Sequence, residues 1–167
     1  MITFLTLNTL PRRGDRPMAG LWFEAFEVAR VFDHEIRRTV TEADNMWFSN
    51  ATYNPAAIHI DAEYCKGTEF GRPLVNSIFT LGLVIGLSVQ DTTLGTTVAN
   101  LGMTDTRFPH PVFHGDTIRS RTTVKEVRAS KSRPNAGIVT FLHQGFNQRD
   151  EEVCTTVRQA LMLRRPA

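Results

Sequence analysis

The feature that most constrains the fold is a long apolar segment near the middle of the chain, residues 74–89, with the sequence LVNSIFTLGLVIGLSV. It is longer than an ordinary strand and apolar on nearly all sides, which is typical of a helix buried all round. Gly82 and Gly86 are four residues apart, so they lie on one face of this helix and indicate close backbone packing there. The remaining chain must supply the apolar surface that covers the helix.

The residues after Asp91 have a different hydropathy pattern, in which segments of alternating apolar and polar side chains are separated by turn residues. Alternation predicts strands of a sheet that has one buried face and one more polar face. Turns rich in Pro, Gly, Asn and Asp separate the segments. The predicted strands are residues 98–103, 106–113, 116–128, 137–149 and 151–163.

The residues before the long helix predict shorter elements. Residues 32–41 alternate and end in β-branched side chains, so they are predicted to form a strand. Thr41 is suited to cap a short helix, and Asp44 falls at the third helical position, where a carboxylate meets free N–H groups. That helix must end before the Asn-Pro pair at 54–55, and residues 61–65 should form a helical turn.

This order of elements predicts the α+β class: one curved antiparallel sheet wrapped around a single long central helix. Such a sheet has exposed edge strands, and pairing them across a two-fold axis predicts a homodimer or a higher homo-oligomer. Residues 11–17 contain two prolines, a glycine and four charges. We therefore expect residues 1–19 to form an N-terminal arm or flexible tail, and residues 20–167 to form the domain.

Charge and composition exclude several classes of function. The net charge is only +2 and the basic residues are scattered, which argues against a nucleic-acid partner. No apolar run is long enough to span a bilayer, so no membrane partner is expected, and the apolar residues 1–7 lack the basic start of a signal peptide. Cys65 and Cys154 lack metal-ligand spacing and are expected to be free thiols. Together these features predict a cytoplasmic protein.

A candidate small-molecule site lies just before the long helix. Residues 53–61 place a histidine, His59, between Ile58 and Ile60 after an Asn-Pro turn, and residues 69–77 run through a Gly-Arg-Pro loop into the helix. Polar groups beside apolar ones, on loops that lead into a buried helix, are what such a site needs.

Four segments of the sequence resemble a known family. They are residues 40–44, 54–64, 70–75 and 111–117, which occur in the family's order and at similar spacing. Over roughly residues 20–165 the chain resembles the MaoC-like dehydratases, hot-dog-fold enzymes that include the (R)-specific enoyl-CoA hydratases. The resemblance implies a hot-dog fold and a carbon–oxygen lyase that adds water reversibly to a short, branched or dicarboxylic 2-enoyl-CoA. No cofactor is implied, since the acyl-CoA is itself the substrate.

The residues found in two of the motifs resemble those of one branch of that family. Asn54 with Pro55, together with Asn76 and Ser77, is similar to the branch associated with mesaconyl-, itaconyl- or methylmalyl-CoA chemistry. The family pattern has an aspartate five residues before the catalytic histidine. Here the histidine is His59, and the position five before it is Asn54, so the carboxylate is absent.

Hydration of an enoyl thioester needs a base for water, an acid for the α-carbon and donors for the enolate oxygen. The resemblance assigns proton transfer to His59, while the N–H of Ser77 at the helix start matches the family's oxyanion donor. An amide has no useful basicity, so Asn54 would orient water or substrate. Alternatively, Asn54 binds a substrate carboxylate, is only a turn residue before proline, or marks lost catalysis. The alternative for His59 is a hydrogen-bonded core histidine.

Substrate binding is predicted for Asn76, Arg72 and Arg107. Either guanidinium can pair with a substrate carboxylate or a CoA phosphate, and a solvated surface role is the alternative for each. His110 and His114 flank an apolar tripeptide and have no third ligand at a fitting spacing, so no metal site is predicted.

Two other functions compete with the lyase. A hot-dog thioesterase would need a carboxylate on or beside the central helix, and residues 74–86 contain neither Asp nor Glu. A non-catalytic acyl-CoA-binding protein is the third possibility, because the family aspartate is absent.

Overall fold

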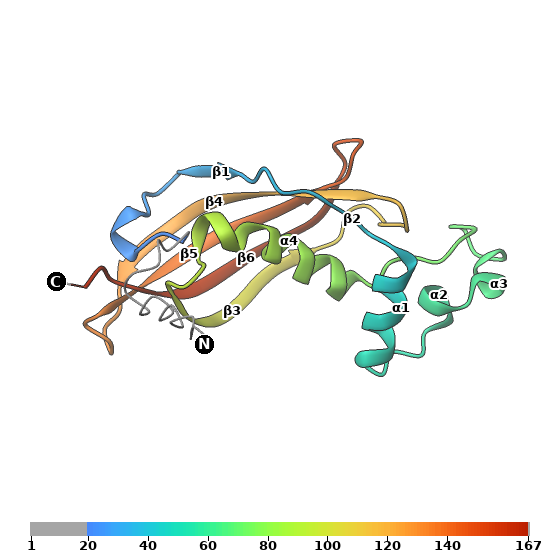
Figure 1. Cartoon of the computed structure of the whole chain (residues 1–167), viewed down its shortest axis with the longest axis horizontal. Coiled ribbons are helices and arrows are strands. Elements are labelled where there is room, and N and C mark those ends of the chain that lie inside the picture. The colour runs from blue at the N-terminus through green and yellow to red at the C-terminus, as the bar shows by residue number, and fades with distance from the viewer. Residues whose placement is uncertain (1–19, 167) are drawn as a thin grey trace, which may run out of the picture.

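The architecture, seen in a computed structural model that describes residues 20–166, is a long helix lying across one antiparallel sheet. Helix α4, Ser77–Thr92, crosses the sheet, and its N-terminal end projects toward three shorter helices beyond the sheet's end (Figure 1). These helices are α1, α2 and α3, with bounds Glu42–Ala51, Ala57–Ile60 and Ala62–Cys65. A 3-10 turn, η1, covers Phe23–Ala25 near the other end.

The sheet has the strand order β1-β4-β5-β6-β3, and the short strand β2 also pairs with β4. All pairs are antiparallel. Strand β3 therefore forms one outer edge of the described sheet and β1 the other. The strands are β1 Val31–Asp33, β2 Arg38–Thr39, β3 Thr97–Arg107, β4 Thr117–Ala129, β5 Ala136–Phe146 and β6 Glu152–Leu163.

Two buried apolar clusters hold α4 and η1 against the sheet. Gly145 on β5 allows α4 to approach the sheet closely, since an added Cβ there would lie 2.3 Å from a methyl of Val84. The outer face of α4 is different: an added Cβ at Gly82 or Gly86 would meet no described atom within 4 Å. The predicted close packing at those two glycines is therefore wrong within the described chain. The first cluster contains Val40, Val75, Val84, Leu87, Val112, Ile118, Val153 and Cys154, and the second Phe23, Phe26, Val124, Val139, Phe141, Ala160 and Met162.

The strand predicted over residues 32–41 is broken into β1 and β2. The break begins at His34, whose ring turns inward to bond the Asp91 carboxylate at 2.8 Å and the Thr122 hydroxyl at 2.9 Å. Both short strands still pair with β4. The alternating pattern thus predicted strand structure in this segment but not the interruption.

The sequence predicted two strands, over 98–103 and 106–113, and this division is wrong. One strand, β3, runs from Thr97 to Arg107 with three register shifts against β6. The following segment is a loop, apart from a single bridge between Phe113 and Leu74. Prolines 109 and 111 lack the N–H that a continuing ladder requires.

The helix predicted to begin at residue 74 begins at Ser77. The N–H of Leu74 donates to Ile58 and the N–H of Val75 to Val112, each at 2.9 Å, so both residues are extended. Asn76 then caps α4, its side chain accepting from the Ile78 N–H at 3.0 Å. The α1 start was predicted correctly, since Thr41 and Asp44 form a reciprocal capping box.

The α+β class is confirmed, with one antiparallel sheet on a long central helix. The N-terminal arm predicted for residues 1–19 lies outside the described residues. Within the described part of the chain, no helix is both long and apolar enough to cross a membrane.

Candidate active site

His59 lies on the one-turn helix α2 and is half-buried. Its Nδ1 is 2.8 Å from the carbonyl oxygen of Leu74. A carbonyl can only accept, so Nδ1 must carry the proton. In the neutral ring Nε2 is then the unprotonated nitrogen, which is the form that can take a proton from water. The contact that orients His59 therefore also selects its tautomer.

The first turn of α4 presents free backbone donors. Asn76 occupies the cap position, and Ser77 is the first helical residue. The Asn76 side chain satisfies the Ile78 N–H, but the Ser77 N–H has no acceptor among the described residues. An unbonded N–H at the positive end of a helix dipole favours an anionic oxygen. The backbone donor predicted at Ser77 is thus available.

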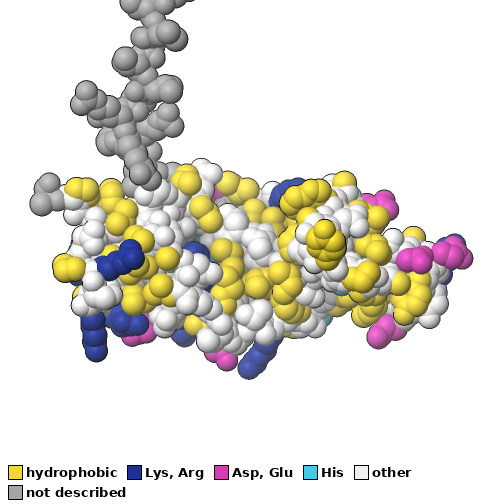
Figure 2. Space-filling model, turned by 90° about the horizontal axis from the view of Figure 1, so that it is seen from below, with side chains coloured by type: hydrophobic (Ala, Val, Ile, Leu, Met, Phe, Trp, Pro, Cys, Tyr) yellow, Lys and Arg dark blue, Asp and Glu magenta, His cyan; other side chains and the backbone are white. Residues whose placement is uncertain are grey.

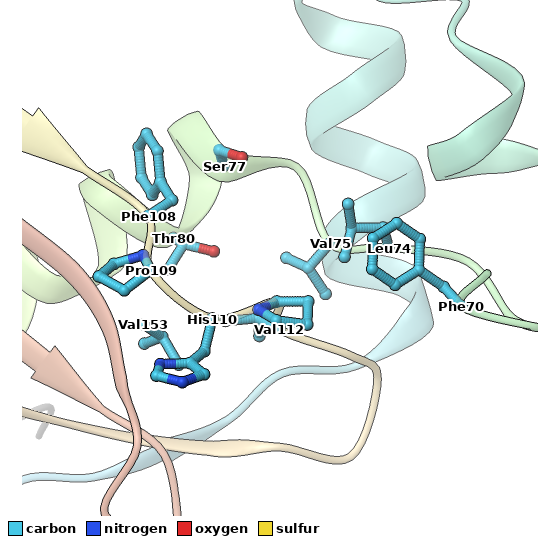
Figure 3. Close-up of a pocket in the computed structure, with 11 residues that line it drawn as sticks. Phe70, Leu74, Val75, Ser77, Thr80, Phe108, Pro109, His110, Val112 and Val153 are labelled. Carbon is cyan, nitrogen blue, oxygen red and sulfur yellow. The ribbon is translucent and has the colours of Figure 1, made fainter.

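A cavity opens beside this turn, between the start of α4, the loop after β3 and the start of β6 (Figure 3). Ser77 and Thr80 supply hydroxyls on one side, and His110 lies across from them beside Val153. His110 is held by a 2.9 Å contact from its Nδ1 to the Glu152 carbonyl. The other lining residues are mostly apolar: Phe70, Leu74, Val75, Phe108, Pro109, Pro111 and Val112. An apolar cavity with few polar groups suits an acyl chain.

Asn54 serves the turn that precedes Pro55. Its side-chain oxygen accepts from the Ala56 N–H at 3.1 Å, which is the turn role considered from sequence. No hydrogen bond joins Asn54 to His59 among the described residues. Asn54 and Asn76 do line one shallow cavity together, and its other lining residues are Phe48, Thr52 and Ile78. The amide nitrogen of Asn54 has no hydrogen-bond partner within residues 20–166, so it can serve a ligand.

The two predicted arginines lie in different places. Arg72 is exposed and its guanidinium sits 3.9 Å from the ring centroid of Phe113, and that ring packs near Phe70 of the larger cavity. Arg107 is exposed at the end of β3 and lines none of the cavities described above. Of the two, Arg72 is the one connected to the cavity, through the rings of Phe113 and Phe70.

Sequence reasoning missed Asn45. This residue is fully buried on α1, and its side chain contacts His59, Leu74, Asn76 and the ring of His114. In the sequence it follows Asp44 and looks like another polar residue on an exposed helix face. Only the folded contacts show that it faces inward. No cluster of three His, Cys, Asp or Glu side chains suited to a metal occurs within residues 20–166.

Comparison with known proteins identifies relatives of this chain. Mesaconyl-CoA hydratase of Cereibacter sphaeroides is 32% identical over 149 residues, covering 88% of this chain and 42% of that protein. Beta-methylmalyl-CoA dehydratase of Chloroflexus aurantiacus is 28% identical over 146 residues, covering 87% of this chain and 41% of that protein. This chain thus spans less than half the length of these two curated relatives.

Solved structures share the fold. The MaoC-like dehydratase from Rhodospirillum rubrum has a TM-score of 0.76 and 29% identity, covering 89% of this chain and all (100%) of that one. A Mycobacterium tuberculosis protein with a double hotdog fold has a TM-score of 0.79 at 23% identity, covering 90% of this chain and 46% of that one. The hot-dog prediction is confirmed, as is the predicted similarity to mesaconyl-CoA and methylmalyl-CoA enzymes.

A family description covers most of the chain. Residues 24–146 match the MaoC like domain, a span that includes His59, Asn54, Asn76 and Ser77. The same span contains the capped start of α4 and the whole of β3, β4 and β5. The chain therefore belongs to the MaoC-like family.

Proposed function

We propose that this chain adds water reversibly to the double bond of a 2-enoyl-CoA thioester, as a cofactor-free hydratase or dehydratase. The observation that carries the proposal is the Nδ1–H bond from His59 to the Leu74 carbonyl. It leaves Nε2 as an acceptor on α2, which this bond joins to the segment that leads into α4. The names of the relatives, which describe hydration and dehydration of acyl-CoA thioesters, support the same reaction.

In the proposed reaction His59 Nε2 takes a proton from water while the water oxygen bonds to the β-carbon. The electrons of the double bond move to the thioester carbonyl, which becomes an enolate. The Ser77 N–H and the helix dipole stabilise that oxygen. The imidazolium then gives its proton to the α-carbon, which restores the neutral His59 for the next turnover. In this scheme His59 acts as both base and acid, because no aspartate precedes it.

The substrate we favour carries a free carboxylate in addition to its thioester. The two relatives are named for mesaconyl-CoA and methylmalyl-CoA, and the shallow cavity contains two amides, those of Asn54 and Asn76. We assign the free amide nitrogen of Asn54 to the substrate carboxylate. Arg72, whose guanidinium lies on the Phe113 ring, is assigned to a CoA phosphate. Arg107 is retained as a second candidate for that phosphate.

Two copies of the chain are proposed to pair through β3. This strand is an unpaired edge of the described sheet, and it exposes apolar side chains, with Val98 39% exposed, Leu101 48% and Met103 38%. Figure 2, which views the side where β3 lies in Figure 1, shows apolar side chains spread over much of that face. A relative about twice as long contains a double hotdog. Pairing would bury the edge.

The alternative thioesterase chemistry lacks support near Ser77. The acidic residue of α4, Asp91, lies at the far end of the helix and bonds His34.

The two free cysteines are buried, and burial, followed by the charge of Glu152, raises the pKa of Cys154 to about 12. Buried cysteines that form no disulfide with each other support a cytoplasmic location, and they also keep the background low in thiol assays.

One substrate screen tests this proposal. Crotonyl-, mesaconyl- and itaconyl-CoA are incubated with the chain while enoyl absorbance and free thiol are followed together. Loss of absorbance without thiol release is expected, fastest with a dicarboxylic substrate. Thiol release would instead identify a thioesterase. A rise in melting temperature with acyl-CoA, without turnover of any thioester, would identify a binding protein.

A further inference from the structure

One buried amide joins the separate parts of the candidate site. The Asn45 Nδ2 lies 2.9 Å from the His59 carbonyl, 3.2 Å from the Leu74 carbonyl and 3.1 Å from His114 Nε2. Its Oδ1 accepts from the Asn76 N–H at 2.9 Å. The partners belong to α2, the extended segment before α4, and the turn after β3, which are connected here through a single side chain.

The orientation of this amide is fixed by its partners. A backbone N–H faces Oδ1, so that atom must be the oxygen, and two carbonyls face Nδ2, so that atom must be the donor. The same donor requires His114 Nε2 to be an acceptor. Aspartate would keep the acceptor but lose every donor, while an apolar residue would lose both. Asparagine is therefore the short side chain that offers an acceptor to the Asn76 N–H and two N–H donors to the three acceptors around Nδ2.

The contacts couple the proposed base to the proposed oxyanion donor. The Leu74 carbonyl accepts from Asn45 and also from His59 Nδ1, the bond that sets the histidine tautomer. The Asn76 N–H, held by the same amide, belongs to the residue that caps α4 immediately before Ser77. We propose that Asn45 is a positioning residue that fixes the His59 imidazole relative to the first turn of α4. This inference rests on the proposed hydratase function.

The kinetic test compares Asn45→Ala and Asn45→Asp with the unchanged chain. A misplaced base is expected to lower kcat about 100-fold, with KM changing by less than about threefold because the cavity lining is untouched. If Asn45→Ala does not fold, Asn45→Asp carries the test, since it keeps the acceptor for Asn76. A kcat within about twofold of the original chain in the folded variants would overturn the proposal.

Asn147 provides a matched control. It is also buried, and its side chain bonds the Glu151 carboxylate and the N–H groups of Arg149 and Glu151 in the turn after β5. Asn147→Ala should lower the melting temperature but leave kcat within about twofold. An equal loss of kcat in Asn147→Ala and Asn45→Ala would show a general effect of destabilisation and would overturn the positioning role.

A second readout does not depend on turnover. The imidazole nitrogens of His59 are followed by ¹⁵N NMR, and the resonance is assigned by its loss in His59→Gln. The original chain should show the Nδ1–H tautomer, and Asn45→Asp should shift the ring toward a mixture. An unchanged tautomer would overturn the proposal. If the chain hydrates no enoyl-CoA but the tautomer shifts, Asn45 positions His59 and only the proposed reaction is refuted.

Discussion

At the scale of single residues, a buried histidine on β5 links stability to pH. His143 Nδ1 contacts the Thr122 hydroxyl at 2.9 Å, and that hydroxyl also contacts His34, which bonds Asp91. Burial lowers the pKa of His143 to about 3, with smaller contributions from the charges of Arg158 and His34. The folded chain therefore holds this ring neutral, whereas the unfolded chain protonates it near its ordinary pKa of 6.5.

This difference predicts a loss of stability in mild acid. Below pH 6.5 the unfolded state binds a proton that the folded state does not, so the free energy of unfolding falls as pH falls, until about pH 3. Between pH 7 and pH 5 this one group should remove about 2 kcal/mol. Urea unfolding at both pH values checks it, with His143→Gln as the comparison. Equal losses in the two chains would contradict the assignment, since all other groups titrate in both.

Asp116 predicts that stability also depends on pH in a more acidic range. Burial alone would raise the pKa of its carboxyl, but bonds from Gln148, the Phe113 N–H and Arg149 outweigh burial and lower the pKa. Its stabilisation is therefore present above the ordinary pKa of 3.8 and is lost as pH falls below that value. Asp116→Asn should cost roughly 1–3 kcal/mol at pH 7. The gap between the two chains, measured by denaturant unfolding, should narrow below pH 4; a constant gap would show that the charge is unimportant.

Site residues differed in how well the sequence predicted them. His59, Ser77 and Asn54 stand in short motifs, so a resemblance could assign roles to them. Asn45 could not be found that way, because its partners lie 14, 31 and 69 positions away in the sequence. Which side chain faces inward on α1 depends on how α1 packs against α2 and the segment before α4. The spacing of residues within α1 does not determine that packing.

At the scale of elements, the distance between α4 and the sheet depends on one glycine. A Cβ at position 145 would lie 2.3 Å from a Val84 methyl, and valine is stiff about χ1. Gly145→Ala should therefore destabilise the chain by about 1–3 kcal/mol. Adding Val84→Ala should recover part of that loss, because it removes the clashing methyl groups. A double-mutant cycle measures the coupling; simple additivity of the two losses would contradict the contact.

Local signals predicted helix starts better than strand limits. The capping box at Thr41 acts within three residues and appears in the fold, whereas the apolar run from residue 74 placed the start of α4 three residues too early. The interruption between β1 and β2 depends instead on Asp91 and Thr122, which hold His34 from distant elements. The same limitation explains β3, which pairs with β6 from Thr97 to Arg107 across the predicted gap, while the rest of the second predicted strand is a loop.

At the scale of the whole molecule, pairing through β3 predicts a change of mass on mutation. Leu101→Lys with Met103→Lys places two charges on the edge that the proposed partner would cover. Sedimentation should show a dimer for the original chain and a monomer for this variant. Val31→Lys is the matched control, because Val31 is 51% exposed on β1 at the opposite edge. A dimer that survives both charges, or one that is lost in the control, would contradict pairing through β3.

The central claim, that His59 transfers the proton during enoyl-CoA hydration, is tested most directly by one rate comparison. The initial rate of absorbance loss is measured on the best enoyl-CoA for the original chain and for His59→Gln, with folding checked by circular dichroism. Losing the proton-transfer group should lower kcat by at least about 100-fold, with no free thiol formed by either chain. Full turnover in His59→Gln would contradict the account.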